Sequence, residues 1–186
     1  MTRKSFDPAA WAMPQPVSII GTYDEQGTPD AMNAAWTGQY DAKQVILCLS
    51  EGHKTYKNIK QNGEFTISFG TKKEVAACDY VGIATGNKVA DKIAKTGWTI
   101  IQSTQVKAPT FEQLPMTLEC RLCGETDNGN LIADIIAITC DEQYLDESGK
   151  PDLEKMELIT FNAMKATYHK VGGEVARAWS VGKSLI

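Results

Sequence analysis

The sequence predicts a mainly β fold, an antiparallel Greek-key-type barrel with helices packed on its outside. Apolar runs of roughly four to eight residues, rich in β-branched side chains, outnumber the stretches with helical spacing. These runs tend to occur in pairs joined by turn residues, which is the pattern of antiparallel hairpins. The 186 residues, 42% hydrophobic and 23% charged, can bury one sizeable core, so we expect a single domain over 1–186.

The strands follow from these apolar runs in chain order. Short β-branched runs predict strands over 16–23, 31–38, 44–50, 64–70 and 98–103. The longest hairpin is predicted over 115–139, because Asp-Asn-Gly in "TDNGN" is a strong turn signal between two β-rich runs. A last segment covers 158–173.

Three helices are predicted between the strands. The segment 54–63 ends at an Asn-Gly stop, and 72–86 carries apolar residues at mixed helical spacing. The segment 89–97 is a short amphipathic helix closed by a glycine. Since these helices interrupt a strand-rich chain, we expect them on the outside of the barrel.

Charge and hydropathy exclude several functional classes. The net charge of −4, with both signs interspersed, leaves no basic stripe for a phosphate backbone, so nucleic acid is not expected as the main partner. No stretch approaches the roughly 20 apolar residues of a membrane span, and the N-terminus lacks a continuous apolar core of a signal peptide. We therefore expect a cytoplasmic protein without a membrane partner.

The five cysteines predict reduced thiols rather than a disulfide framework, because their number is odd and their density low. Cys120 and Cys123 form a Cys-x-x-Cys pair within a predicted strand. Residues three apart on a strand point to opposite faces, so these thiols are not expected to share a zinc ion or a disulfide. We expect no metal site.

The stretch "SEGHKTYKNI" joins a predicted strand to a predicted helix. Its backbone N–H groups lie where a helix N-terminus can face an anion, and Ser50, Lys54 and Thr55 are suitable phosphate donors. The alternative is a helix N-cap with Lys54 and Lys57 as solvated charges. His53 has no companion metal ligands nearby in the sequence.

Five stretches, taken together in their order along the chain, resemble one known family. They are "PQPVSIIGTYDEQGTPDAMNAAW", "LCLSEGHKTYKNI", "DYVGIATGNKVADKIAKTGW", "LECRL" and "TYHKVGGEVARAW". They are similar to the opening hairpin, phosphate loop, helical region, following strand and C-terminal segment of the flavin reductase-like FMN-binding split β-barrels. The flavoredoxin-like members are the most similar.

The resemblance implies FMN as the cofactor and a set of residues that contact it. Small alanines after the second strand would let the flat ring approach, and the phosphate loop would hold the other end. The implied cofactor-binding residues are Asn33, Ala34, Ala35, Trp36, Thr37, Ser50, His53, Lys54, Thr55, Asn58, Thr85, Lys88 and Lys92. Tyr168 and His169 are weaker possibilities, and no catalytic residue is identified.

Three of these assignments have structural alternatives. Trp36 can instead belong to the core, Tyr168 can be a barrel residue, and Lys92 can pair with Asp91 or a neighbouring acid on a solvated face. The resemblance, together with sheet edges that need covering, also leads us to expect a homodimer with FMN near the subunit boundary.

The resemblance implies an FMN-dependent oxidoreductase that passes electrons from NAD(P)H or a protein donor to a flavin or another acceptor, such as a redox partner protein. The chain has no Gly-x-Gly-x-x-Gly motif, so NAD(P)H would bind transiently over the flavin. Two alternatives remain open. One is a pyridoxamine-phosphate-oxidase-like enzyme, and the other is a non-redox protein that binds a phosphorylated ligand.

Overall fold

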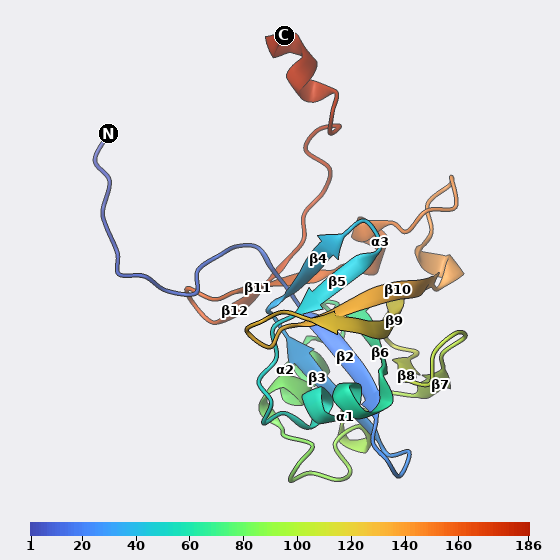
Figure 1. Cartoon of the computed structure of the whole chain (residues 1–186). Coiled ribbons are helices and arrows are strands. Elements are labelled where there is room, and N and C mark those ends of the chain that lie inside the picture. The colour runs from blue at the N-terminus through green and yellow to red at the C-terminus, as the bar shows by residue number, and fades with distance from the viewer.

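The computed structural model describes residues 1–186 and is mainly β, as predicted. Its strands are β1 (Gln15–Pro16), β2 (Ser18–Tyr23), β3 (Pro29–Ala34), β4 (Thr37–Asp41), β5 (Gln44–Leu47), β6 (Glu64–Phe69), β7 (Ile100–Gln102), β8 (Pro109–Phe111), β9 (Met116–Glu125), β10 (Leu131–Cys140), β11 (Ile159–Asn162) and β12 (Thr167–Lys170). Seven of them form one antiparallel sheet in the order β3-β2-β6-β9-β10-β5-β4. A sheet β1-β11-β12 and the pair β7-β8 stand beside it (Figure 1).

The large sheet curls into a barrel that stays open between β3 and β4. These two strands are the edges of the sheet, yet only Ala35 and Trp36 connect them along the chain. The sheet must therefore bend until its edges approach each other. The hydroxyl groups of Ser18 on β2 and Thr37 on β4 lie 2.7 Å apart, which joins the two sides near the opening. An antiparallel barrel with this opening is the split barrel that the sequence led us to expect.

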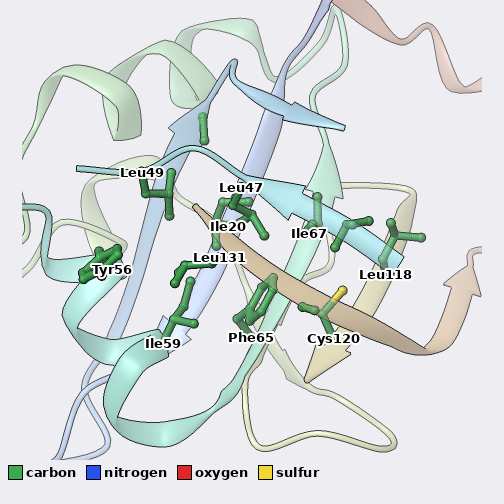
Figure 2. Packing of buried hydrophobic residues seen from close by; sticks show 13 residues of the cluster. Ile20, Leu47, Leu49, Tyr56, Ile59, Phe65, Ile67, Leu118, Cys120 and Leu131 are labelled. Carbon is green, nitrogen blue, oxygen red and sulfur yellow. The ribbon is translucent and has the colours of Figure 1, made fainter. Parts of the chain in front are cut away.

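The inside of the curled sheet holds one hydrophobic cluster of 13 buried residues (Figure 2). Strand side chains alternate in direction, so Ile20 points into this cluster while its neighbour Ile19 points to the other side of the sheet. Helix α1 (Lys54–Asn62) contributes Tyr56 and Ile59 to the cluster and so covers part of it. Burying each large apolar side chain stabilises the fold by about 1.5–3 kcal/mol.

A second cluster of ten buried residues lies on the outer side of β2 and β3. Helix α2 (Val75–Ile83) packs there with Cys78 and Val81 against Ile19 and Ala31. Because β2 and β3 separate the two clusters, their positions are fixed from both faces. This rigid placement of β3 matters for the site described below.

The helices differ in part from the prediction. Helix α1 ends at Gly63 in the left-handed conformation (φ 70°), whose N–H donates to the carbonyl oxygen of Ile59, so the Asn-Gly stop is confirmed. The amphipathic helix predicted over 89–97 is wrong, because only Ala94–Thr96 forms a short 3₁₀ turn before Gly97. A segment this short gains little from helix propagation.

The remaining helical elements were not predicted. They are α3 (Leu153–Met156) and the 3₁₀ turns Glu142–Tyr144 and Val181–Leu185. None of the helices is long and apolar enough to cross a membrane.

The long hairpin of β9 and β10 is confirmed, with Gly129 in the left-handed conformation (φ 84°) in its turn. On β9 the thiol of Cys120 is fully buried, whereas Cys123 is exposed, so the two thiols point to opposite sides as predicted. Burial raises the pKa of Cys120 to about 12, which keeps it protonated at neutral pH. A protonated, buried thiol behaves as a small apolar side chain.

This difference in burial predicts unequal effects of substitution. Cys120→Ser places a hydroxyl group in the core and is expected to lower the free energy of unfolding by about 1–3 kcal/mol. Cys123→Ser on the exposed side should change it by less than about 0.5 kcal/mol. Urea unfolding of the two variants measures both values. Equal losses, or one zinc ion per wild-type chain, would contradict the assignment.

The two ends of the chain extend away from the body as arms (Figure 1). We call residues 1–14 the N-terminal arm and residues 172–186 the C-terminal arm; every residue in both is exposed. The N-terminal arm makes one internal backbone hydrogen bond, from Trp11 N–H to the carbonyl oxygen of Ala9. The arms therefore receive little support from their own chain.

Candidate functional site

Edge strand β3 separates two cavities because its side chains alternate between its faces. Asp30 and Met32 face a cavity of about 200 Å³, and Asn33 and the following Ala35 face one of about 250 Å³. We call the first the α1 cavity; it is lined by Asp30, Met32, His53, Lys54, Thr55, Val81, Gly82, Ile83, Ala84, Thr85, Gly86 and Lys92. We call the second the β12 cavity; it is lined by Asn33, Ala35, Asp79, Gly82, Ile83, Phe161 and Tyr168.

The two cavities adjoin at the end of α2. Gly82 and Ile83 line both of them, so they adjoin at the outer edge of β3. A Cβ atom on Gly82 would lie 3.2 Å from the Cβ atom of Asn33, and a glycine here allows the helix to approach the strand closely. An elongated ligand can therefore reach from one cavity to the other around β3.

The α1 cavity has a buried group of charged and polar side chains in its wall. The hydroxyl of Thr55 donates to Asp30 Oδ2 at 2.9 Å. Lys92 Nζ donates to the carbonyl oxygen of Ala31 at 2.6 Å and lies 3.6 Å from Asp30 Oδ1. Asp30 Oδ1 is buried and receives no hydrogen bond. Lys92 therefore balances the charge of Asp30 mainly through electrostatic attraction.

Burial and charge act in opposite directions on Lys92. Removal from water lowers the pKa of its ammonium group, and the nearby Asp30 carboxylate partly opposes this shift. Lys92 and Asp30 are both about 3% exposed at their side chains. The charged state of Lys92 thus depends on the nearby Asp30 carboxylate.

Lys54 supplies a second cation at this cavity. Its ammonium group lies 3.0 Å from Asp24 Oδ2, and both side chains keep some contact with solvent. Burial raises the pKa of Asp24, but the hydrogen bonds from Lys54 and from the Thr28 N–H outweigh this effect and lower it overall. Because Lys54 is only partly enclosed, it is the lysine of this cavity that an incoming anion can reach most readily.

The loop after α2 closes one side of the α1 cavity. The side-chain amide of Asn87 donates to the carbonyl oxygen of Gly52 at 3.0 Å and so ties this loop to the start of α1. Gly86 packs directly over the Asp30 carboxylate, where a Cβ atom would collide with Asp30 Oδ1 and would lie 3.0 Å from Lys54 Cδ. The loop can take this position only because residue 86 has no side chain.

Gly86→Ala is therefore expected to lower the free energy of unfolding by about 1–3 kcal/mol, because Thr55 and Lys92 hold Asp30 in place and the loop must move. Gly52→Ala is the matched control, since a Cβ atom there would meet nothing within 4 Å. The control should change the free energy by no more than about 1 kcal/mol. Urea unfolding compares the two variants, and equal values would show that the loop is not packed as described.

The β12 cavity combines polar groups with apolar surface. The hydroxyl of Tyr168 donates to Asp79 Oδ1 at 2.8 Å, and the Asn33 amide lies 3.5 Å from the Tyr168 oxygen. Burial and then Asp79 raise the pKa of Tyr168, so its hydroxyl stays protonated at neutral pH. The ring of Phe161 lies 5.8 Å from that of Tyr168, centre to centre. This cavity can offer a flat ligand both a hydrogen-bonding side and an apolar side.

Residues 11–157 match the model of the flavin reductase like domain. The chain belongs to the flavin reductase-like family. The flavoredoxin of Desulfovibrio vulgaris (Miyazaki F) is 33% identical and has a TM-score of 0.94, with 98% of this chain and 100% of that chain covered.

Two further solved structures are similar to this flavin reductase-like chain. The flavoredoxin from Methanosarcina acetivorans is 26% identical with a TM-score of 0.90, and both chains are covered completely. An FMN-binding domain of a flavin reductase-like enzyme from Shewanella baltica is 21% identical with a TM-score of 0.77, covering 88% of this chain and 89% of that one. The similarity to the Shewanella baltica domain, at 21% identity, shows a shared fold only.

The structure of this flavin reductase-like chain brings together seven of the residues that the sequence analysis assigned to the cofactor. His53, Lys54, Thr55, Thr85 and Lys92 line the α1 cavity, and Asn33 and Ala35 line the β12 cavity. The alternative that Lys92 pairs with Asp91 or a neighbouring acid on a solvated face is wrong, because Lys92 is buried beside Asp30 and Asp91 pairs with Lys95 instead. Helix capping by a side chain is also not found, since the N-cap residue His53 makes no such bond.

The other six predicted residues lie elsewhere. Ser50 and Lys88 are exposed outside both cavities, and Trp36 is 57% exposed beside the opening of the barrel. Three more point away from the cavities, namely Ala34 in the inner cluster, Thr37 bonded to Ser18, and Asn58, whose buried amide donates to Thr22. His169 is exposed and bonds Thr167, so it does not line the β12 cavity.

Sequence reasoning missed Asp30, Asp79, Gly82, Ile83 and Phe161, all of which line a cavity. Asp30 follows Gly-Thr-Pro and is typical of a turn, so its position inside the flavin reductase-like fold was not expected. Side chains alternate between the two faces of a strand, so a strand over 29–35 places Asp30 and Met32 on one face and Asn33 and Ala35 on the other. That signal was available in the sequence.

Proposed function

We propose that this chain is an FMN-dependent redox protein that transfers electrons from NAD(P)H or a protein donor, through FMN, to a flavin or another acceptor. The observation that carries the proposal is the pair of adjoining cavities on either face of β3. One has cationic side chains and the other has small and aromatic ones. FMN has the same division between an anionic phosphate and a flat ring.

The side chains of the α1 cavity fit a phosphate group. Lys54 Nζ and His53 are accessible, and the first N–H groups of the nine-residue helix α1 begin at the same place. Lys92 contributes positive charge from the buried wall of the cavity, although its ammonium group already donates to the carbonyl oxygen of Ala31. The hydroxyl hydrogen of Thr55 is directed at Asp30, so Lys54 is the main side-chain donor available to the phosphate.

The side chains of the β12 cavity fit the flavin ring. Ala35 and Gly82 are small enough to admit a flat ligand, and Phe161 and Ile83 give it apolar contact. Asn33 and the Tyr168–Asp79 pair place hydrogen-bonding groups at the same cavity. A negative charge at Asp79 would disfavour the addition of electrons to a nearby flavin ring. The reduced ring would then give up its electrons more readily, which suits a strong reductant.

Bound FMN accepts hydride and releases one or two electrons, so the protein itself needs to bind, orient and expose the ring. The side chains of the α1 cavity can bind the phosphate, and those of the β12 cavity can orient the ring and leave it exposed. The membership in the flavin reductase-like family and the names of the two similar flavoredoxins support this function. An approach of NAD(P)H to the open side of the β12 cavity would place donor and ring together.

The experiment is to purify the chain, add FMN, remove the unbound part and record the absorption spectrum. The proposal expects a yellow protein with about one FMN per chain. Under anaerobic conditions, NADH or NADPH or a reduced protein donor should bleach this spectrum, and an added acceptor should restore it. A chain that binds no flavin would overturn the proposal and favour a non-redox protein that binds a phosphorylated ligand. A bound flavin that no donor reduces would overturn the redox role.

A further inference from the structure

The ammonium group of Lys54, the main donor proposed for the phosphate, is already held by its own chain. It donates a hydrogen bond to Asp24 Oδ2 at 3.0 Å. The side chains of Lys54 and Asp24 are 20% and 15% exposed, so solvent screens this ion pair only in part. An ammonium group has three N–H donors, and the contact with Asp24 uses one of them. A phosphate in the α1 cavity would therefore share Lys54 with a carboxylate.

The turn between β2 and β3 fixes Asp24 through its other oxygen. Asp24 Oδ1 accepts hydrogen bonds from the N–H groups of Gln26 and Thr28 at 3.1 and 2.7 Å. The backbone closes the same turn, because Asp24 N–H donates to the Thr28 carbonyl oxygen and Gly27 N–H donates to the Asp24 carbonyl oxygen. Burial alone would raise the pKa of Asp24, but its hydrogen bonds with Lys54 and Thr28 lower it overall. The carboxylate thus keeps both its position and its charge at neutral pH.

The Lys54–Asp24 pair lies between two cavities. Lys54 lines the α1 cavity, whereas Asp24 and its neighbour Glu25 line a separate cavity of about 500 Å³, which we call the turn cavity. The carboxylate therefore contacts the ammonium group from the turn cavity, and a phosphate would contact it from the α1 cavity. The loop after α2 limits the movement of Lys54, since a Cβ atom on Gly86 would lie 3.0 Å from Lys54 Cδ. The lysine cannot easily turn from one partner to the other.

Asp24 would affect a bound phosphate in two opposite ways. Holding the flexible Lys54 side chain in place reduces the entropy lost on binding, which is worth up to about tenfold in affinity. The carboxylate also repels the phosphate. With both anions in contact with one ammonium group, they would lie roughly 6 Å apart, and at an effective dielectric constant of about 20 this repulsion weakens binding about a hundredfold. The repulsion is therefore the larger effect, and the net weakening is about tenfold.

We propose that Asp24 limits the affinity for FMN by competing with the phosphate for Lys54, so that bound FMN exchanges with FMN in solution. This inference rests on the proposed binding of the FMN phosphate in the α1 cavity. Riboflavin has no phosphate, so Asp24 does not affect its binding. Asp24 therefore also reduces the preference of the site for FMN over riboflavin, and the β2–β3 turn that fixes Asp24 becomes part of the control of flavin binding.

The test titrates FMN and riboflavin against the wild type, Asp24→Asn and Glu25→Gln, with the fold checked by circular dichroism. Asparagine keeps an oxygen for the N–H groups of the turn but lacks the negative charge. Asp24→Asn should strengthen FMN binding about tenfold and leave riboflavin binding unchanged. Glu25→Gln is the matched control, because Glu25 is exposed and lines the same turn cavity; it should change both affinities by less than about twofold. Damage to the turn would weaken both flavins, so it cannot produce a gain for FMN alone.

A second comparison tests whether Asp24 acts through Lys54. In the Lys54→Ala background, Asp24→Asn should strengthen FMN binding less than in the wild type, because no ammonium group remains to be released. Asp24→Ser also keeps a side-chain oxygen for the turn and replaces Asp24→Asn if that variant does not fold. Unchanged or weaker FMN binding in the single variant overturns this inference alone, and so does an equal gain in the Lys54→Ala background. A wild type that binds no FMN overturns the proposed function as well.

Discussion

Lys92→Met is expected to lower the free energy of unfolding by about 3–5 kcal/mol, because it leaves a buried carboxylate without its cation. Asp30 would keep the hydrogen bond from Thr55 at one oxygen, and its other oxygen already receives none. The carbonyl oxygen of Ala31 would also lose its bond from the Lys92 ammonium group. Urea unfolding of the wild type and the variant measures the difference.

Two companion variants separate charge from packing. Lys95→Met removes an exposed lysine that pairs with Asp91 at 3.0 Å, and should cost less than about 1 kcal/mol. Adding Asp30→Asn to Lys92→Met removes the unpaired charge, so the double variant should be more stable than Lys92→Met alone. If Lys92→Met costs no more than Lys95→Met, the Asp30–Lys92 pair does not stabilise the fold as described.

Lys54→Ala is expected to weaken FMN binding roughly 10- to 150-fold, since a hydrogen bond to a charged group contributes about 1.5–3 kcal/mol. Riboflavin lacks the phosphate, so its affinity should stay the same. The change is confined to Lys54 because Thr55 also satisfies the buried Asp30, and removing its hydroxyl would affect the fold. Titration of both flavins, followed by fluorescence, gives the two affinities.

The matched control for this experiment is Lys57→Ala on the same helix. Lys57 is exposed, lines neither cavity and carries the same charge. It should leave both affinities nearly unchanged, which separates a specific contact from the general loss of one positive charge. Equal weakening of FMN and riboflavin by Lys54→Ala would mean that the phosphate binds elsewhere.

The sequence was informative where the signals are local. The Asp-Asn-Gly turn signal between two β-rich runs located the hairpin of β9 and β10, and the Asn-Gly pair located the end of α1. The position of Lys54 and Thr55 beside a cavity also followed from one short strand-to-helix junction. Each of these features depends on residues that are close together in the chain.

The rest of the site depends on contacts between distant residues. Lys92 and Ala31 are 61 positions apart, and nothing near either one indicates that the lysine is buried there. The helix predicted over 89–97 is wrong in the same region, where the Lys92 ammonium group reaches inward to β3 and only Ala94–Thr96 forms a 3₁₀ turn.

The alternation along β3 also determines how this strand must align with β2. Ala31 faces Gly21 and Asn33 faces Ile19 in the observed pairing. A slip by one residue would turn every side chain of β3 to the opposite face. Asp30 would then leave Lys92 and enter the apolar cluster beside α2, while Asn33 would turn toward the inside of the barrel. Such a misaligned chain would bury an uncompensated charge, so the residues that form the two cavities also select the correct strand pairing during folding.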